Sequence, residues 1–161
     1  MLTVRQEENM RLALSLAAEA ASEGEVPVGC VIVGPDGAVI GRGRNRREAS
    51  NNALAHAELE AISEACEKLH NWRLDGCAMY VTLEPCPMCA GAIFNARISE
   101  LYYGAKDQQT GSCGSVINLF MENYGFSPKI VGGLLSDECA GVLTGFFKKL
   151  RSTGADEINK M

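Results

Sequence analysis

Two cysteines with metal-ligand spacing, Cys86 and Cys89, follow a proline in the middle of the chain. Spaced three apart at the start of a helix, they can place two thiolates near one point. Such a pair has three interpretations: half of a structural zinc site, a redox dithiol, or two core cysteines. The chain has two histidines, and one of them, His56, stands two residues before the carboxylate of Glu58.

The histidine and the glutamate distinguish these interpretations. A structural zinc site normally has four protein ligands, but the chain has no second Cys-x-x-Cys and no Cys-x-x-His. A thioredoxin-like dithiol also follows a strand and opens a helix, yet it does not account for His56 and Glu58. Three ligands, His56, Cys86 and Cys89, would leave a fourth tetrahedral position for water. The residues therefore favour a catalytic zinc site.

Glu58 is the predicted proton shuttle of that site. Zinc lowers the pKa of bound water to about 7, and a nearby carboxylate can take the proton and pass it to a substrate ring and then to a departing amine. Two residues along a helix turn by about 200°, so Glu58 does not share a helix face with His56. It is expected to reach around the metal without binding it.

Composition predicts one globular, cytoplasmic domain. The 161 residues are 47% hydrophobic and 22% charged, no apolar run is long enough to span a membrane, and the N-terminus opens with charged residues. An odd number of scattered cysteines does not suggest a disulfide framework. The five cysteines outside the pair are expected to be small buried residues: Cys30, Cys66, Cys77, Cys113 and Cys139.

The formal charge of -5 does not indicate nucleic-acid binding, which usually shows as an excess of Lys and Arg. The basic residues are nevertheless concentrated in two stretches. These are Arg42, Arg44, Arg46 and Arg47, and then Lys148, Lys149 and Arg151. An anionic ligand could therefore still meet a positive strip on an acidic protein.

Hydrophobic periodicity predicts alternating helices and strands. The expected helices are 4–23, 55–69, 85–96 and 136–150, with Pro85 and Pro87 in the first turn of the third, Ser136 as the N-cap of the last, and a short helix starting near 116–121. The expected strands are 28–33, 38–41, 77–82, 100–104 and 129–132, with loops at 42–54 and 107–115. This order predicts an α/β fold, a three-layer α/β/α sandwich around a five-stranded mixed sheet. We expect the domain to cover 1–151, with 152–161 as a C-terminal tail.

A family resemblance extends over nearly the whole chain. His-x-Glu followed by Pro-Cys-x-x-Cys is the signature of zinc deaminases, and further matching stretches occur at 25–29, 55–58, 80–92, 104–107 and 137–139. The chain resembles the cytidine/deoxycytidylate deaminase superfamily, and more closely the bacterial tRNA adenosine deaminases. That resemblance implies a zinc-dependent homodimer that converts adenosine to inosine at the wobble position of a tRNA anticodon.

The same resemblance implies three substrate contacts, and each has a simpler alternative. Asn45 would hydrogen-bond the flipped nucleotide, or it is a loop asparagine. Asp107 would lie against a ribose, or it is a turn former. Phe147 would stack on a neighbouring base, or it belongs to the core. The arginines around Asn45 would contact phosphates of the anticodon loop, or they form a solvated loop.

Two other functions stay open at this stage. The acidic balance favours a deaminase of a free base or nucleoside, such as guanine or cytidine, which would share the same zinc motif. A non-enzymatic zinc or dithiol protein built on Cys86 and Cys89 is the alternative from a different class, and it would not require Glu58.

Overall fold

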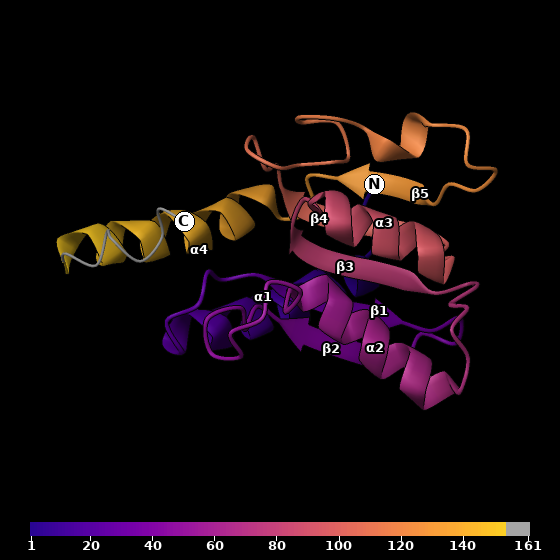
Figure 1. The fold of residues 1–161 in the computed structure, drawn as a ribbon, viewed down its shortest axis with the longest axis horizontal. Helices are drawn as coiled ribbons and strands as arrows, with labels where there is room; N and C mark the ends of the chain where they lie inside the picture. Colours follow the sequence, from indigo (N-terminus) through magenta and orange to yellow (C-terminus); the bar gives the residue numbers. More distant parts are fainter. Residues whose placement is uncertain (154–161) are drawn as a thin grey trace.

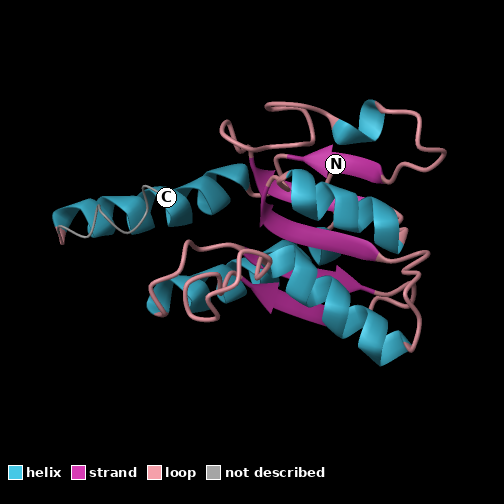
Figure 2. Cartoon of the chain, viewed as in Figure 1, coloured by secondary structure: helices cyan, strands magenta, loops and turns pink. Residues whose placement is uncertain are grey.

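A five-stranded mixed sheet lies between two layers of helices (Figures 1 and 2). The computed structural model describes residues 1–153. The strands are β1 (Gly29–Val33), β2 (Val39–Arg44), β3 (Ala78–Leu83), β4 (Glu100–Ala105) and β5 (Lys129–Gly132). The helices are α1 (Val4–Ser22), α2 (Ala57–Leu69), α3 (Pro87–Ala96), α4 (Ser136–Ser152) and the short 3-10 helix η1 (Leu119–Met121).

The sheet has the strand order β2-β1-β3-β4-β5. Strand β1 pairs antiparallel with both β2 and β3, whereas β3, β4 and β5 run parallel to one another. Parallel neighbours need crossover connections, and α3 supplies the one between β3 and β4. The ends of β3 and β4 that carry their last residues therefore meet at one edge of the sheet.

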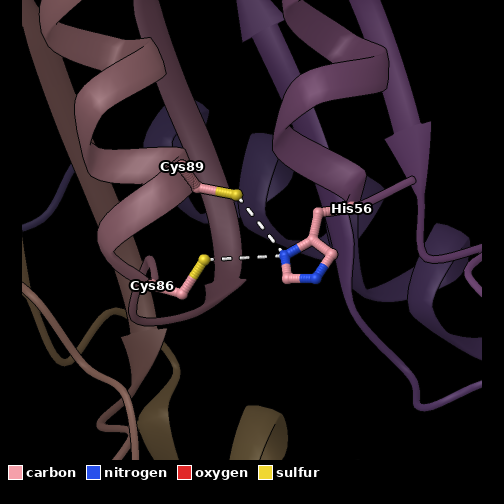
Figure 3. Close-up of side chains that lie close together, drawn as sticks. All are labelled: His56, Cys86 and Cys89. Carbon is pink, nitrogen blue, oxygen red and sulfur yellow. Dashed lines mark hydrogen bonds between the residues drawn. The ribbon is translucent and has the colours of Figure 1, made fainter. Parts of the chain in front are cut away.

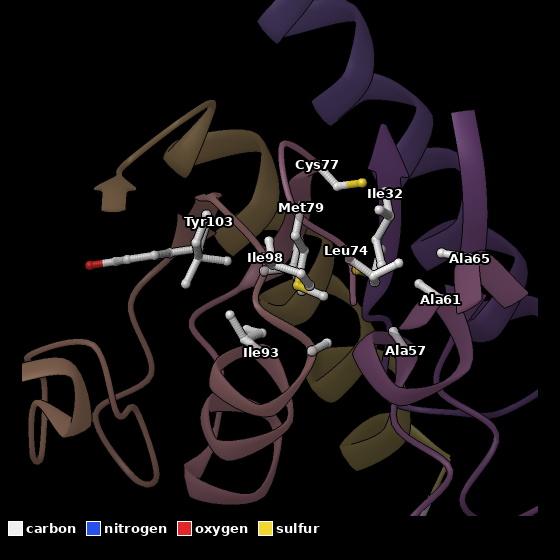
Figure 4. Close-up of a cluster of buried hydrophobic side chains, with 14 of the residues drawn as sticks. Ile32, Ala57, Ala61, Ala65, Leu74, Cys77, Met79, Ile93, Ile98 and Tyr103 are labelled. Carbon is white, nitrogen blue, oxygen red and sulfur yellow. The ribbon is translucent and has the colours of Figure 1, made fainter. Parts of the chain in front are cut away.

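Each face of the sheet carries its own hydrophobic core. Helices α2 and α3 cover one face, where Ala57, Ala61 and Ile93 pack against Ile32 and Met79 (Figure 4). Helices α1 and α4 lie on the opposite face, where Met10 and Ala13 pack against the other side of the same strands. The predicted three-layer fold around a five-stranded mixed sheet is confirmed.

Helix α4 lies against the sheet only at its beginning. Cys139 is its one buried residue within the described chain, and the helix then extends beyond the edge of the sheet (Figure 1). The predicted N-cap, Ser136, is wrong: the cap position is Leu135, in a left-handed conformation with φ 52°, and Ser136 is the first helical residue. The tight turn at Gly133, with φ 89°, places the cap one residue earlier in the chain than the sequence predicted.

Two predictions for the whole chain concern its C-terminal tail and membrane-spanning segments. Most of the predicted tail, residues 154–161, lies outside the described residues. Within the part of the chain that the structure describes, no helix is long and apolar enough to cross a membrane.

Candidate metal centre and active site

The first turns of two neighbouring helices carry the candidate metal ligands. His56 is the N-cap of α2, Cys86 is the N-cap of α3, and Pro87 is the first residue of that helix. Neither cap residue uses its side chain to cap its own helix, so the imidazole and the thiol are free to bind elsewhere. Because α2 and α3 are adjacent in the same layer, these residues meet although 30 positions separate them in the sequence.

The imidazole of His56 points its Nδ1 at both sulfurs (Figure 3). The distance from Nδ1 to the sulfur of Cys86 is 3.7 Å, and to the sulfur of Cys89 it is 3.5 Å. All three potential ligand atoms lie within 4.8 Å of one another. Which imidazole nitrogen faces the cluster could not be read from the sequence, and the structure selects Nδ1.

These distances fit a tetrahedral zinc ion. With Zn–N near 2.05 Å and Zn–S near 2.3 Å, the nitrogen and sulfur ligands of a tetrahedron stand about 3.6 Å apart. The two observed separations, 3.5 and 3.7 Å, bracket that value. One nitrogen and two sulfurs are also a donor set that zinc prefers. His56, Cys86 and Cys89 could therefore hold a metal and leave one coordination position for another ligand.

The electrostatics of the cluster favour negative charge on sulfur. The pKa of Cys86 is lowered to about 4, first by its interaction with Cys89 and then by its hydrogen bond with His56. The pKa of Cys89 is raised, first by its hydrogen bond to Cys86 and then by burial, so one proton stays on the pair. The pKa of His56 is raised by its hydrogen bond with Cys86. The N-terminal ends of α2 and α3 carry partial positive charge, which also stabilises a thiolate at Cys86.

Glu58 lies beside the cluster, in the first turn of α2, and is 4% exposed. Its Oε2 accepts a hydrogen bond of 3.1 Å from the sulfur of Cys89. Burial raises the pKa of its carboxyl, against the opposing effect of the hydrogen bond from Cys89. A carboxyl with a raised pKa can both accept and donate a proton near neutral pH.

The cluster opens into a pocket of about 840 Å³. The predicted site residues on its wall are Asn45, His56, Glu58, Cys86, Asp107 and Phe147. Cys89 is the exception: it is fully buried behind the wall. The fold therefore brings the predicted catalytic, metal-binding and substrate-binding residues to one place.

Asn45 follows β2, and its side chain is already held by the backbone. Its Nδ2 donates to the carbonyl of Val26 at 3.2 Å, and its Oδ1 accepts from the amide of Arg47 at 3.2 Å. The side chain is 9% exposed. The amide is thus fixed in orientation, with one N–H left to reach a substrate.

Asp107 combines the two interpretations that the sequence allowed, whereas Phe147 lies on the pocket wall and outside the core. Asp107 accepts hydrogen bonds from Gln109 and Thr110, including 2.8 Å from the Thr110 hydroxyl, so it does form a turn while it lines the pocket. Phe147 contacts Phe146 edge to face, with ring centroids 5.4 Å apart. Neither phenylalanine belongs to a core cluster, so the core alternative for Phe147 is wrong.

The arginine group is largely paired with carboxylates. Arg44 forms ion pairs with Glu23 at 2.7 Å and Glu19 at 3.7 Å, and Arg46 pairs with Glu60 at 2.7 Å. Arg47 is the member of the group that lines the pocket. These arginines are therefore less available to phosphates than their clustering in the sequence suggested.

Two buried carboxylates near the pocket carried no predicted role. Glu25 and Glu84 are each 1% exposed. Glu25 accepts the backbone amides of Glu48 and Ala49, and Glu84 accepts those of Cys113 and Ser115. Both lie in stretches that carry the family resemblance, but their long-range partners could not be read from sequence spacing.

A His/Cys/Cys cluster with an adjacent buried carboxylate, on a three-layer α/β/α fold, defines the class of hydrolytic nucleobase deaminases. Residues 4–151 match the MafB19-like deaminase family. The tRNA-specific adenosine deaminase of Bacillus subtilis is 44% identical over 143 residues, which cover 88% of each chain. That of Streptococcus pyogenes serotype M18 is 43% identical over 88% of this chain and 89% of its own. The chain therefore belongs to the MafB19-like deaminase family. Its relatives include tRNA-specific adenosine deaminases.

Two solved structures extend the comparison. A protein from a study of A-to-I editing by tRNA:A34 deaminases at the wobble position is 45% identical, with a TM-score of 0.81 over 84% of this chain and 99% of its own. A guanine deaminase of Bacillus subtilis is 39% identical, with a TM-score of 0.61 over 76% of this chain and 77% of its own.

Proposed function

We propose that the protein deaminates adenosine to inosine at the wobble position of a tRNA anticodon, as a zinc-dependent hydrolase acting in the cytoplasm. The observation that carries this proposal is the agreement with the tRNA:A34 deaminase structure, which matches over 99% of its own length. The pocket supports the proposal because it joins the His/Cys/Cys cluster and Glu58 to loops that could receive an extruded nucleotide.

Zinc is the proposed cofactor, held by His56, Cys86 and Cys89, whose separations fit a tetrahedral ion. Bound there, zinc would supply a hydroxide nucleophile at neutral pH, because it lowers the pKa of water to about 7. His56 and Cys86 are held at the N-cap positions of α2 and α3, and Cys89 lies in the first turn of α3. Two thiolates and one neutral imidazole would reduce the net charge of the ion to zero.

Glu58 moves the protons of the proposed reaction. Its carboxylate takes a proton from the attacking water and delivers it to the ring nitrogen of adenine as the new C–O bond forms at C6. It then carries the second proton of the water to the amino group, which leaves as ammonia when the C–N bond breaks. Adenosine and water thus give inosine and ammonia, and Glu58 ends in its starting state.

The walls of the pocket hold the substrate in the proposed complex. Val26, Val28 and Ala57 provide an apolar surface near the cluster against which a purine can pack. The remaining N–H of Asn45 would donate to the nucleotide, and Phe147 would stack on a neighbouring base. The turn at Asp107 would lie against a ribose.

Inosine formation tests the proposal directly. Purified zinc-loaded protein is incubated with an anticodon stem-loop that carries adenosine at the wobble position, and nucleosides are analysed before and after. Inosine should form in proportion to enzyme. No inosine, together with turnover of free guanine or cytidine, would contradict the proposal.

Guanine deamination is the second candidate, because a guanine deaminase of the same fold is 39% identical. Under this alternative the pocket would accept a free base, and the protein would need no contacts with a ribose, a phosphate or a neighbouring base. Free guanine at the same enzyme concentration is therefore the matched substrate in the inosine experiment.

Two further features belong to the proposal. Residues 1–151 would form the deaminase domain, supported by the family match at 4–151, with 152–161 as a tail.

The enzyme would act as a homodimer, and large apolar side chains exposed in this single chain could supply the contact: Leu54, Val116, Ile117, Met121 and Tyr124. Sedimentation of the purified protein should show a mass of two chains; a single-chain mass at micromolar concentration would contradict this.

A further inference from the structure

The loop of residues 106–116 forms one wall of the pocket. It follows β4, and Lys106, Asp107 and Thr110 are among the residues that it contributes to the lining. Several of its side chains are exposed, so packing of these side chains alone cannot fix its course. Its position must come from backbone contacts with the rest of the site.

Glu84 supplies those contacts from beneath the loop. It follows β3 directly and precedes Cys86 by two residues. Its Oε2 accepts the backbone amides of Cys113 at 3.1 Å and of Ser115 at 3.2 Å. Its Oε1 accepts the hydroxyl of Ser115 at 2.5 Å. Hydrogen bonds to a carboxylate are stronger than those between neutral groups, so one side chain fixes the second half of the loop.

The loop also fits closely against this carboxylate. A Cβ at Gly111 would lie 2.1 Å from Oε2 of Glu84 and 2.4 Å from the carbonyl oxygen of Asp107, so only glycine allows this approach. The amide of Ser112 donates to the carbonyl of Pro85 at 2.9 Å. The loop is therefore fastened to residues 84 and 85, immediately before a candidate metal ligand.

A buried carboxylate that does not take part in the proposed proton transfers needs another reason to be there, because burying a charge is costly unless it is fully hydrogen-bonded. We propose that Glu84 is a positioning residue: it holds the 106–116 loop at a fixed place relative to the metal ligands and thereby sets substrate affinity. The kinetic part of this inference rests on the proposed function, whereas the bracing of the loop does not.

Glu84→Ala and Glu84→Gln test the proposal together, with zinc-loaded protein and the anticodon stem-loop as substrate. Alanine removes three hydrogen bonds, and we expect KM to rise by about tenfold or more while kcat changes by less than about threefold, because losing binding that is equal in the ground state and the transition state raises KM and leaves kcat unchanged. Glutamine should recover most of the affinity, since its oxygen can accept both amides and its N–H₂ can donate to the Ser115 hydroxyl. Zinc content should stay at the wild-type level in both.

Hydrogen–deuterium exchange of the 106–116 loop gives a readout that is independent of activity. Its amides should exchange faster in Glu84→Ala than in wild type or Glu84→Gln, while amides of α2 and β1 keep their wild-type rates. Asp75→Ala is the matched control, because this exposed carboxylate pairs with Arg73 away from the pocket, and it should change neither exchange nor KM.

Gly111→Ala approaches the same contact from the loop side and replaces Glu84→Ala if that variant does not fold. It should raise KM and loop exchange in the same way, because the added methyl displaces the carboxylate. Unchanged exchange and KM in a folded variant would overturn the proposal, as would loss of zinc and kcat with KM unaltered. If wild-type protein makes no inosine, the proposed function fails, and the exchange measurement still decides whether Glu84 holds the loop.

Discussion

The chemistry of the site depends on where four side chains stand relative to one another. His56, Cys86 and Cys89 converge with the spacing of zinc ligands, and Glu58 reaches the cluster through Cys89. Burial raises the pKa of Glu58, which suits a group that must accept and release protons. Ligation and proton transfer are thus assigned to different residues, and substitutions should separate them.

Glu58→Gln should abolish deamination without loss of metal. The amide keeps the size of the side chain but cannot take a proton, so kcat should fall by at least about 10²-fold, the usual contribution of a general acid–base group. Inosine formation and zinc content are measured on the same sample. Glu64→Gln, an exposed position on the same helix, is the control; a Glu58→Gln enzyme with wild-type kcat would remove the assigned role.

Cys86→Ser should lose the metal and the stability that the metal gives. At a ligand concentration of 1,000 Kd, binding stabilises a fold by about 4 kcal/mol, which is roughly 10 °C in Tm for a chain of this size. Wild-type protein treated with a chelator should lose that increment and regain it with zinc. Cys66→Ser, a half-buried thiol outside the cluster, should keep the response, and a zinc-dependent Tm in Cys86→Ser would count against its ligand role.

At the scale of elements, the site exists because two helices begin side by side. Helix α2 rests on β2 through Gly43, where a Cβ would lie 2.0 Å from the carbonyl oxygen of Ala57. This close approach sets the position of the first turn of α2, which carries His56 and Glu58. Strand β3 and the start of α3 then bring Cys86 and Cys89 to the same edge of the sheet.

Gly43→Ala should therefore displace α2 and disturb the arrangement of the candidate metal ligands. Overpacking of this kind costs about 1–3 kcal/mol, and zinc affinity should fall as well because His56 moves with the helix. Urea unfolding and zinc titration measure the two effects. Gly141→Ala is the control, since nothing lies within 4 Å of the added methyl on α4; there alanine should stabilise by up to about 1 kcal/mol. Equal stabilities for wild type and Gly43→Ala would contradict the packing argument.

At the scale of the whole molecule, the proposed function requires an acidic protein to bind a polyanion. The formal charge is -5, and three of the four clustered arginines are engaged by carboxylates: Arg44 and Arg46 at 2.7 Å, and Arg47 with Glu48 at 3.3 Å. Arg47 and Lys106 remain on the wall of the pocket. Lys148 and Lys149 lie near the C-terminal end of α4, the helix that extends beyond the edge of the sheet (Figure 1). Positive charge is thus placed near the pocket mouth and along one projecting helix.

Salt should accordingly weaken tRNA turnover. For single strands the binding constant falls with a log–log slope of about -0.7 per phosphate contacted, so two to three contacts predict a drop in kcat/KM of roughly 7- to 20-fold between 50 and 200 mM salt. Lys106→Ala should reduce the steepness of this log–log slope by about 0.7, the value for one phosphate contact. Turnover of any neutral free base that the enzyme accepts is the control; a tRNA reaction insensitive to salt would argue against phosphate contacts.

The sequence by itself determined the order of the elements, the layered fold and the candidate metal ligands. Periodicity reports local backbone structure, and the His-x-Glu and Pro-Cys-x-x-Cys spacings report chemistry within single turns, so both can be read without the fold. The N-cap position at Leu135 was missed because a left-handed residue other than glycine or asparagine leaves little sequence signal.

Only the tertiary structure decided which groups face one another. It turned Nδ1 of His56 toward the sulfurs, paired Arg44 and Arg46 with distant glutamates, and placed Phe147 on the pocket wall outside the core. It also buried Glu84 under a loop nearly thirty residues further along the chain. Each of these contacts joins segments far apart in sequence, and their geometry follows from how the helices pack on the sheet, which local spacing does not encode.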